Sequence, residues 1–157
     1  MNFLRVSLTS RRIAAALAIA AITATMLTAC APAVSLNAAE DSNNPGCAEV
    51  MVRLPETVAL EKRRNTDAQS TAAWGEPASV LLRCGIPPVE VSTMPCVTVQ
   101  DIDWLVDDSK APSYRFITFA RTPATEIIVD SKSVSGSSVL DELASATASG
   151  KVSRRCQ

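Results

Sequence analysis

The feature that most restricts the fold of this chain is the placement of its five cysteines along 157 residues. Cys30 follows an apolar run near the N-terminus, and the other four are Cys47, Cys84, Cys96 and Cys156. An odd count leaves one thiol outside any set of intramolecular disulfides. In an oxidising compartment the remaining four would form two disulfides, each stabilising a domain by about 3–5 kcal/mol. The compartment, and therefore the N-terminus, decides how the cysteines are used.

The first thirty residues have the composition of a secretory signal. Arg5, Arg11 and Arg12 are the only charged residues before Cys30, and residues 13–27 are all apolar or small. A positively charged start followed by an apolar segment of this length is typical of a signal peptide. A membrane-spanning helix needs roughly 17–25 apolar residues, so this segment is at or below the limit for spanning.

The segment Leu27-Thr28-Ala29-Cys30 resembles the lipobox of bacterial lipoproteins. The resemblance implies cleavage before Cys30, a diacylglyceryl group on its thiol and a second acylation of the new amino terminus, and several acyl chains give a stable anchor. The alternatives are a conventional cleavage near Ala33, which would discard Cys30, and an uncleaved anchor. Ser10-Arg11-Arg12 also resembles a twin-arginine signal but lacks the usual bulky residues after the pair, so the export route stays open.

We therefore predict a lipoprotein signal peptide over residues 1–29, a lipidated flexible tether over 30–46 and a single domain over 47–157. The tether prediction follows from small, polar and proline residues, and such a chain would reach roughly 20–25 Å. Removal of the leader with its three arginines, from a chain with 15 basic and 16 acidic side chains, leaves a net charge of −4. This mild acidity indicates that nucleic acid is not a partner.

Four cysteines allow three pairings. We favour Cys84–Cys96, which closes a short proline-rich loop, and Cys47–Cys156, which ties the two ends of the domain together. A zinc site is the alternative use of these residues. The chain has no Cys-x-x-Cys spacing and no histidine, which argues against zinc.

A helix is predicted at the start of the domain. Asn44 is a suitable N-cap residue before Pro45 at the first helical position, and Pro55 ends or kinks the helix. One helical face then carries Cys47, Val50, Met51 and Leu54. The charged residues 61–71 that follow are predicted to form a solvated loop.

Five apolar runs rich in β-branched residues predict strands. They span residues 79–84, 96–99, 103–106, 114–120 and 125–130. The last two flank residues 121–124, which predict a hairpin turn. With a tight turn, one face would carry the pairs Phe116–Val129 and Thr118–Ile127. The other face would carry Arg115–Asp130 and Ile117–Ile128, a mixed surface that we expect to be half covered.

A closing helix is predicted near the C-terminus. Ser138 and Asp141 form a capping-box pattern, and the apolar stripe is Val139, Leu140, Leu143 and Ala144. The expected fold is α+β: an antiparallel sheet of about four to five strands, with N- and C-terminal helices packed on one face and two disulfides.

The usual catalytic groups are absent. Without histidine there is no Ser-His-Asp arrangement and no common acid–base group. No Ser-x-x-Lys, Gly-x-Ser-x-Gly or phosphate-binding glycine loop occurs. We expect no catalytic residue, no metal and no cofactor.

Three groups of residues are candidates for binding. Asp101 and Asp103, with further acidic residues at 107 and 108, could form a carboxylate pair or cation site, or simply two polar turns. Arg83, Arg115 and Arg121 could line an anion site, or pair across the sheet as Arg115 with Asp130 would. Trp74 and Trp104 could stack on a sugar or ring, but a tryptophan in a chain with 4% aromatic residues is more often part of the core.

Several motifs together resemble one known family. The stretches "WGEPASVLLRCGIPP", "PCVTVQDIDWLVDD", "YRFITFARTPATEIIVD" and "VSGSSVLDELA", with a terminal "RRC", are similar to actinobacterial secreted proteins and lipoproteins bearing domain of unknown function 3515. The resemblance covers roughly residues 47–156. It implies an actinobacterial envelope location and paired cysteines, and it carries no assigned activity.

The function predicted from these observations is that of a lipid-anchored, non-catalytic module on the extracytoplasmic face of the cell membrane. Its partner would be an envelope protein or a cell-wall component. The alternative is an envelope enzyme that uses carboxylates around Asp101 and Asp103. The arrangement of these two carboxyl groups relative to Trp104 discriminates between the two hypotheses.

Overall fold

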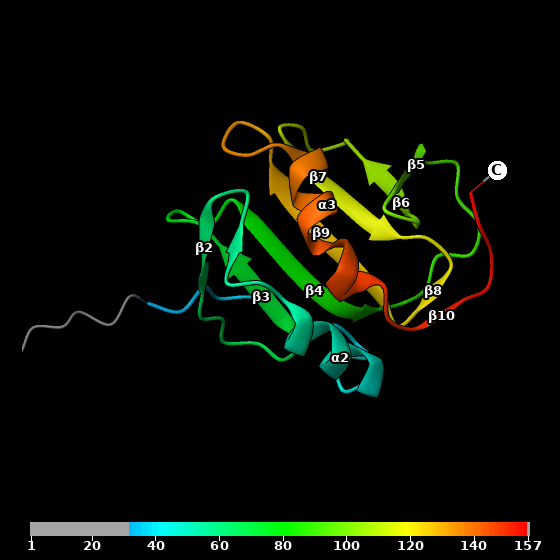
Figure 1. The fold of residues 1–157 in the computed structure, drawn as a ribbon, viewed down its shortest axis with the longest axis horizontal. Helices are drawn as coiled ribbons and strands as arrows, with labels where there is room; N and C mark the ends of the chain where they lie inside the picture. The colour runs from blue at the N-terminus through cyan, green and yellow to red at the C-terminus, as the bar shows by residue number, and fades with distance from the viewer. Residues whose placement is uncertain (1–31, 157) are drawn as a thin grey trace, which may run out of the picture. The chain divides into compact units, whose positions relative to one another are not determined.

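An eight-stranded antiparallel sheet dominates the part of the chain that the structure, a computed structural model, describes, which is residues 32–156 (Figure 1). Its strand order is β1-β2-β3-β4-β9-β7-β6-β5, and a second, two-stranded sheet joins β10 to β8. The elements are α2 (Pro45–Arg53), β1 (Thr57–Val58), β2 (Glu61–Arg64), β3 (Thr71–Trp74), β4 (Val80–Ile86), β5 (Cys96–Val99), β6 (Ile102–Asp107), β7 (Ser113–Thr118), β8 (Arg121–Thr122), β9 (Ala124–Asp130), α3 (Gly136–Thr147) and β10 (Lys151–Val152).

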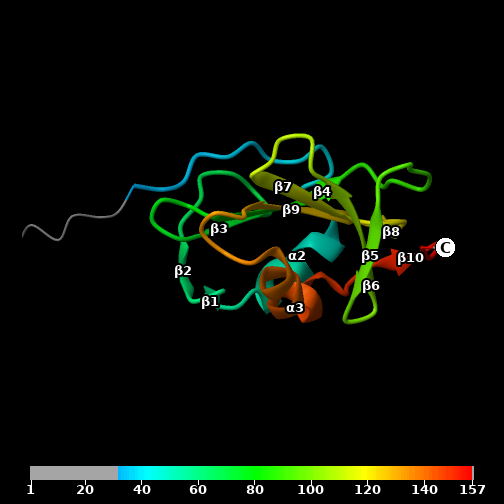
Figure 2. The ribbon, with the colours of Figure 1, turned by 90° about the horizontal axis from the view of Figure 1, so that it is seen from above.

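Both helices cover the same face of the sheet (Figure 2). α2 contacts α3 and β4, and α3 also contacts β9, β5 and β1. The main core lies between the helices and this face. The structure confirms the α+β class with two helices and two disulfides, but the sheet has eight strands rather than four to five. Within residues 32–156, no helix is long and apolar enough to cross a membrane.

Part of the difference in strand number comes from the charged residues 61–71. Their charge predicted a loop, but they contain β2 and the first residue of β3. In β2, Arg63 pairs with Trp74 and Arg64 pairs with Ala73 of β3. Lysine and arginine can lay their aliphatic stems along a sheet while their charges stay in solvent. The loop prediction was therefore wrong, because charge alone does not exclude a strand near the sheet edge.

The first helix forms where the sequence predicted it. Asn44 is the N-cap, its Oδ1 accepts a hydrogen bond from the Gly46 amide at 2.9 Å, and Pro45 occupies the first turn. Cys47 and Val50 are buried against the sheet. The helix ends at Arg53, as the proline at position 55 requires.

The second helix starts earlier than its capping pattern predicted. α3 begins at Gly136 after the N-cap Ser135, whose side chain makes no capping hydrogen bond. The predicted capping box of Ser138 and Asp141 was wrong, because both residues lie inside the helix. Asp141 instead accepts a hydrogen bond from Gln100 at 2.7 Å. The apolar stripe is confirmed: Val139, Leu140, Leu143 and Ala144 are all buried.

The β7–β9 pairing differs by two residues from the predicted register. Phe116 lies opposite Ile127 and Tyr114 opposite Val129, not Phe116 opposite Val129. The connection is longer than a tight turn because it contains β8, which pairs with β10. A shift of two residues keeps every side chain on its predicted face. The predicted core face is therefore buried: Phe116, Thr118, Ile127 and Val129.

The four domain cysteines form two disulfides, but not in the favoured pairing. Cys47 of α2 is bonded to Cys84 of β4, and Cys96 of β5 is bonded to Cys156 near the C-terminus, with Cα–Cα distances of 5.6 and 6.2 Å. The Cys84–Cys96 prediction was wrong because β9, β7 and β6 separate β4 from β5. Four strand spacings amount to about 19 Å, whereas a disulfide requires Cα atoms within about 7 Å.

The N-terminal strap, residues 33–44, replaces most of the predicted tether. The Val34 amide donates to the Asn65 carbonyl at 2.8 Å, and the Leu36 amide donates to Asp67 Oδ1 at 2.9 Å. This hydrogen bond, followed by one from the Ser35 side chain, lowers the pKa of Asp67. Within the described residues, the prediction of a free tether over 30–46 is therefore wrong. Figure 2 shows the strap on the side of the sheet opposite the helices.

A glycine in β4 allows the strap to approach the sheet. The Asp41 amide donates to the Gly85 carbonyl at 2.9 Å. Gly85 has φ +95°, and a Cβ there would lie 2.3 Å from the Asp41 carbonyl oxygen. Only glycine combines this backbone conformation with so close a contact.

Candidate functional site

The face of the sheet opposite the helices is open at its centre. A small second core covers one end of it: Ala39, Ile86, Leu105, Ile117 and Ala124. Beyond that core, alternate residues of the three central strands project from the open face. Arg83 and Leu81 come from β4, Glu126 and Ile128 from β9, and Arg115 from β7.

These side chains line two adjoining hollows. One, of about 210 Å³, lies between β4, β9 and the strap. The other, of about 300 Å³, lies between β4, β9, β7 and the loop after β6. They share Arg83, Glu126 and Ile128. We call the combined site the open-face groove and define it by Leu36, Leu81, Arg83, Asp107, Lys110, Arg115, Glu126 and Ile128.

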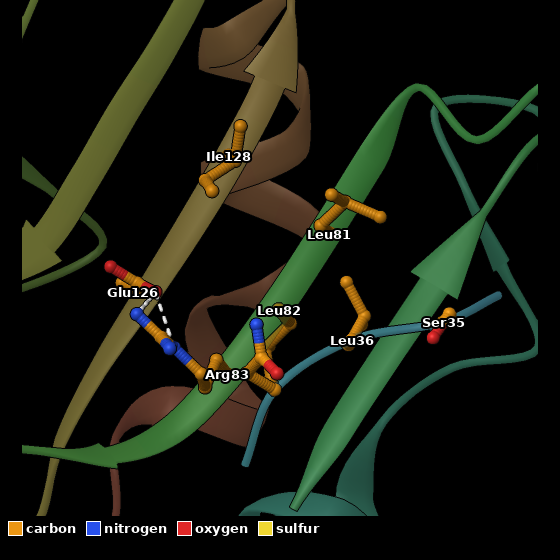
Figure 3. A pocket seen from close by; sticks show the side chains of 8 residues that line it. Ser35, Leu36, Leu81, Leu82, Arg83, Glu126 and Ile128 are labelled. Atoms are coloured by element: carbon orange, nitrogen blue, oxygen red, sulfur yellow. Dashed lines mark hydrogen bonds and ion pairs between the residues drawn. The ribbon is translucent and has the colours of Figure 1, made fainter. Parts of the chain in front are cut away.

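A buried carboxylate organises the groove. Glu126 is 3% exposed and lies between Arg83 and Arg115, whose side chains are 35% and 37% exposed. Arg83 Nε donates to Glu126 Oε1 at 2.6 Å, and Arg115 Nε donates to the other oxygen, Oε2. Figure 3 shows Arg83 and Glu126 reaching toward each other from β4 and β9, with Leu36 on the strap nearby. Charge-assisted hydrogen bonds to both oxygens make the burial of this carboxylate tolerable.

The outer end of the groove carries one more charge of each sign. Lys110 and Asp107 line it together with Ser109 and Arg115. The pKa of Asp107 is lowered first by hydrogen bonds from the Ser109 side chain and amide, and then by the positive charges of Arg115 and Lys110. Asp107 is therefore ionised at neutral pH and contributes one negative charge.

Two of the three predicted arginines meet at this site. The predicted Arg115–Asp130 pair was wrong, because the register shift places Arg115 beside Glu126. Asp130 instead accepts hydrogen bonds from the Lys132 amide and the Ser133 hydroxyl.

Arg121 lies elsewhere and has a structural role. It is buried and donates through Nη1 to the carbonyl oxygens of Ala148 and Ser149, just after α3. Burial, followed by repulsion from Arg155, lowers its pKa. A guanidinium at this position satisfies carbonyl groups at a helix C-terminus.

The acidic cluster does not converge on a site. Asp103 is 6% exposed; it accepts hydrogen bonds from Thr98 Oγ1 at 2.7 Å and the Cys156 amide at 3.0 Å. Asp101 is exposed in the β5–β6 turn at φ +63°. No hollow described above contains both carboxyl groups and Trp104. Over residues 32–156, no group of three potential ligands could hold a metal ion.

Both tryptophans belong to the core. Trp74 and Trp104 are fully buried, and Trp74 Nε1 donates to the Pro55 carbonyl at 3.1 Å. Trp104 Nε1 has no hydrogen-bond partner among the described residues. Neither ring is available for stacking on a ligand in this conformation.

Among the groove residues that the sequence reasoning did not assign to a site are Glu126 and Leu36. A signal for Glu126 was present, because it is the only charge inside the apolar run "TEIIV" and occupies the same face as Ile128. Leu36 gave no signal, since it belongs to the segment predicted to be a tether. Cys30, the predicted lipidation site, lies outside the described residues.

Comparison with known proteins places the chain in a family without assigning an activity. No curated protein and no solved structure matches it. The model of one protein family, described as protein of unknown function (DUF3515), matches residues 8–154. Since this match spans nearly the whole chain, the domain of unknown function 3515 recognised in the sequence is confirmed, and the protein belongs to the DUF3515 family.

Proposed function

We propose that this protein is a lipid-anchored, non-catalytic binding module on the extracytoplasmic face of the cell membrane. The observation that carries the proposal is the contrast between two kinds of polar side chain. Asp103 and Arg121, which could have served chemistry, are buried in structural hydrogen bonds. Arg83 and Arg115 are held in position beside a hollow on the sheet surface.

The two disulfides support the extracytoplasmic part of the proposal. Disulfides persist in oxidising compartments and are rare in the cytosol. Cys30 is not needed for either bond. This agrees with a separate use of its thiol, which the lipobox-like sequence before it would provide.

The strap affects how such an anchor would hold the domain. Only residues 31–33 lie between Cys30 and Val34, whose amide is hydrogen-bonded to Asn65 of the domain. Four Cα–Cα steps span at most about 15 Å. An acylated Cys30 would therefore keep the strap end of the domain nearer the lipid surface than a free sixteen-residue tether would.

Mass spectrometry tests the anchor. Intact protein extracted from membranes should lack residues 1–29 and carry several acyl chains, and Cys30→Ser should abolish the acylation. A full-length mass, or an unmodified chain starting after Cys30, would contradict the proposal.

Photo-crosslinking in living cells tests the binding role. A benzoylphenylalanine in place of Ser35, an exposed residue beside the groove, should give discrete adducts with an envelope component. The matched control is the same substitution at Val52, which is 86% exposed on α2, away from the groove. Equal adducts at both positions, or none at Ser35, would contradict a binding function for this face.

A further inference from the structure

The two groove arginines are oriented so that some of their terminal N–H donors remain available. Both Nε atoms are directed at Glu126. A guanidinium is planar with five N–H donors in fixed directions. An arginine bound side-on through Nε therefore keeps its Nη1 group and the outer N–H of Nη2 directed away from its partner. Over residues 32–156, the Nη atoms of Arg115 have no hydrogen-bond partner, and Arg83 uses only Nη2, on Glu126. The side chains are also about one-third exposed, so these donors can reach a ligand.

The formal charges leave the groove positive. Arg83, Arg115 and Lys110 contribute three positive charges, while Glu126 and Asp107 contribute two negative ones. Because Glu126 is a single carboxylate shared by two arginines, it neutralises only one of them. A monoanion bound at the guanidinium groups would bring the set to neutrality. Since Glu126 already holds both arginines in place, binding a ligand would cost little side-chain entropy of these arginines.

The other half of the groove is apolar. Leu36 on the strap, Leu81 on β4 and Ile128 on β9 line the hollow of about 210 Å³ next to Arg83 (Figure 3). Small-molecule sites typically combine such apolar walls with a few fixed polar groups. A purely structural cross-strand ion pair would need neither the apolar wall nor free donors facing a hollow.

We propose that the open-face groove binds a small organic anion, with its carboxylate or phosphate group on the terminal nitrogens of Arg83 and Arg115 and its apolar part against Leu36, Leu81 and Ile128. This inference rests on the proposed binding function and names its ligand class. Organic carboxylates and organic phosphates share this chemistry, an oxyanion next to an apolar group. Benzoate and phenyl phosphate, one probe of each kind, distinguish between them.

The test is a titration of the full mature chain, followed by amide chemical shifts, with benzoate, phenyl phosphate, inorganic phosphate and the neutral control benzyl alcohol. We expect saturable binding of benzoate or phenyl phosphate, with shifts at Arg83, Arg115 and Ile128. Whichever probe binds more tightly identifies the carboxylate or the phosphate as the preferred group. Benzyl alcohol should bind at least about tenfold more weakly, because it lacks the charge-assisted hydrogen bonds.

Three variants separate the two halves of the site. Arg115→Gln should weaken the binding of both organic anions at least about tenfold, whereas Arg115→Lys should lose less of the affinity. Leu36→Ser should weaken phenyl phosphate more than inorganic phosphate, because only the former has an apolar part. The matched control is Arg53→Gln, which removes an exposed charge on α2 and should leave the binding of every probe unchanged.

Several results would overturn the inference. They are the absence of saturable binding of both organic anions by the folded chain, equal binding of benzyl alcohol, or undiminished binding by Arg115→Gln. If Ser35 crosslinks persist in cells while no anion binds, the ligand class is wrong and the binding function stands. If anions bind but no groove-specific crosslink forms, the function proposed above fails instead.

Discussion

Glu126 is the residue around which the polar part of the open face is built. Its two neighbours approach from opposite sides, Arg83 directly across on β4 and Arg115 diagonally from β7. A buried ion pair is weak evidence for stability, but removing one partner is costly because the other charge is left uncompensated. The arginines are partly exposed, so solvent offsets part of that cost.

Glu126→Gln should therefore destabilise the domain by about 2–4 kcal/mol. The amide keeps the size of the side chain but leaves two guanidinium groups close together without a negative charge. Urea denaturation measures the change in the free energy of unfolding. The control is Glu49→Gln, which breaks an exposed pair with Arg53 and should cost less than about 1 kcal/mol. Equal effects of the two substitutions would show that the Glu126 network adds nothing to stability.

At the scale of elements, two of the contacts that hold the strap can be broken separately. One is the hydrogen bond from the Leu36 amide to Asp67, and the other is the close approach of Asp41 to Gly85. The strap contributes a wall of the groove through Leu36. Whatever loosens the strap should therefore also change the groove.

The Asp67 contact should make the strap sensitive to acid. The pKa of Asp67 is lowered in the folded state, so its contribution to stability is present above the unfolded pKa of about 3.9. It is lost as the pH falls through the lower, folded-state pKa. Amide exchange at Leu36, corrected for intrinsic rates, should show protection near pH 6 that falls below pH ~4. Asp67→Asn should weaken the protection at pH 6 and remove most of its pH dependence.

Gly85→Ala should release the strap from the sheet. The new Cβ would meet the Asp41 carbonyl at 2.3 Å, and the positive φ adds about 1–2 kcal/mol of strain. We expect lower protection of the Val34 and Asp41 amides and faster cleavage of the strap by proteases. Gly46, whose Cβ would meet the ring of Pro123 rather than backbone, supplies a comparison at a different contact. An intact, protected strap in the Gly85→Ala protein would refute this account of the glycine.

At the scale of the whole molecule, the two disulfides tie together parts that are distant in sequence. They span 37 and 60 residues and attach α2 to β4 and the C-terminal segment to β5. Cys156 is also held through its amide by the buried carboxylate of Asp103. The C-terminal segment is thus fixed by a covalent bond and a hydrogen bond next to each other.

Reduction of both disulfides should lower the melting temperature by more than about 10 °C. The reason is that each disulfide contributes about 4 kcal/mol to the free energy of unfolding in the chain-entropy model. Reduction should also proceed in two steps. Cys47 and Cys84 are fully buried, whereas Cys96 and Cys156 are partly exposed. Alkylation followed by mass spectrometry should therefore find Cys96 and Cys156 reduced first. An unchanged melting temperature would mean that the cysteines do not stabilise the domain.

The elements that could be predicted are those whose signal is local. The Asn44-Pro45 start of α2, the apolar stripe of α3 and the strand runs of β4, β5, β6, β7 and β9 follow from capping chemistry and periodicity within a few residues. The tight turn between β5 and β6 at Gln100 and Asp101, both with positive φ, is also a local feature. The family motifs are local as well, which is why they could be seen in the sequence.

The groove could be predicted only in part. The sequence pointed to Arg83 and Arg115 as anion-site candidates, but it paired Arg115 with Asp130 and overlooked Glu126. That error came from the β7–β9 register, because the connection contains β8, which pairs with β10 near the far end of the chain.

By itself, therefore, the sequence determined the α+β class, the helices, the main strands and the membership of the DUF3515 family. Only the tertiary structure decided which cysteines pair, where the strap lies and which carboxylate holds the arginines. The physical reason is that these features depend on strand order across the sheet and on contacts between residues tens of positions apart. Local propensity and hydrophobic pattern carry no information about either.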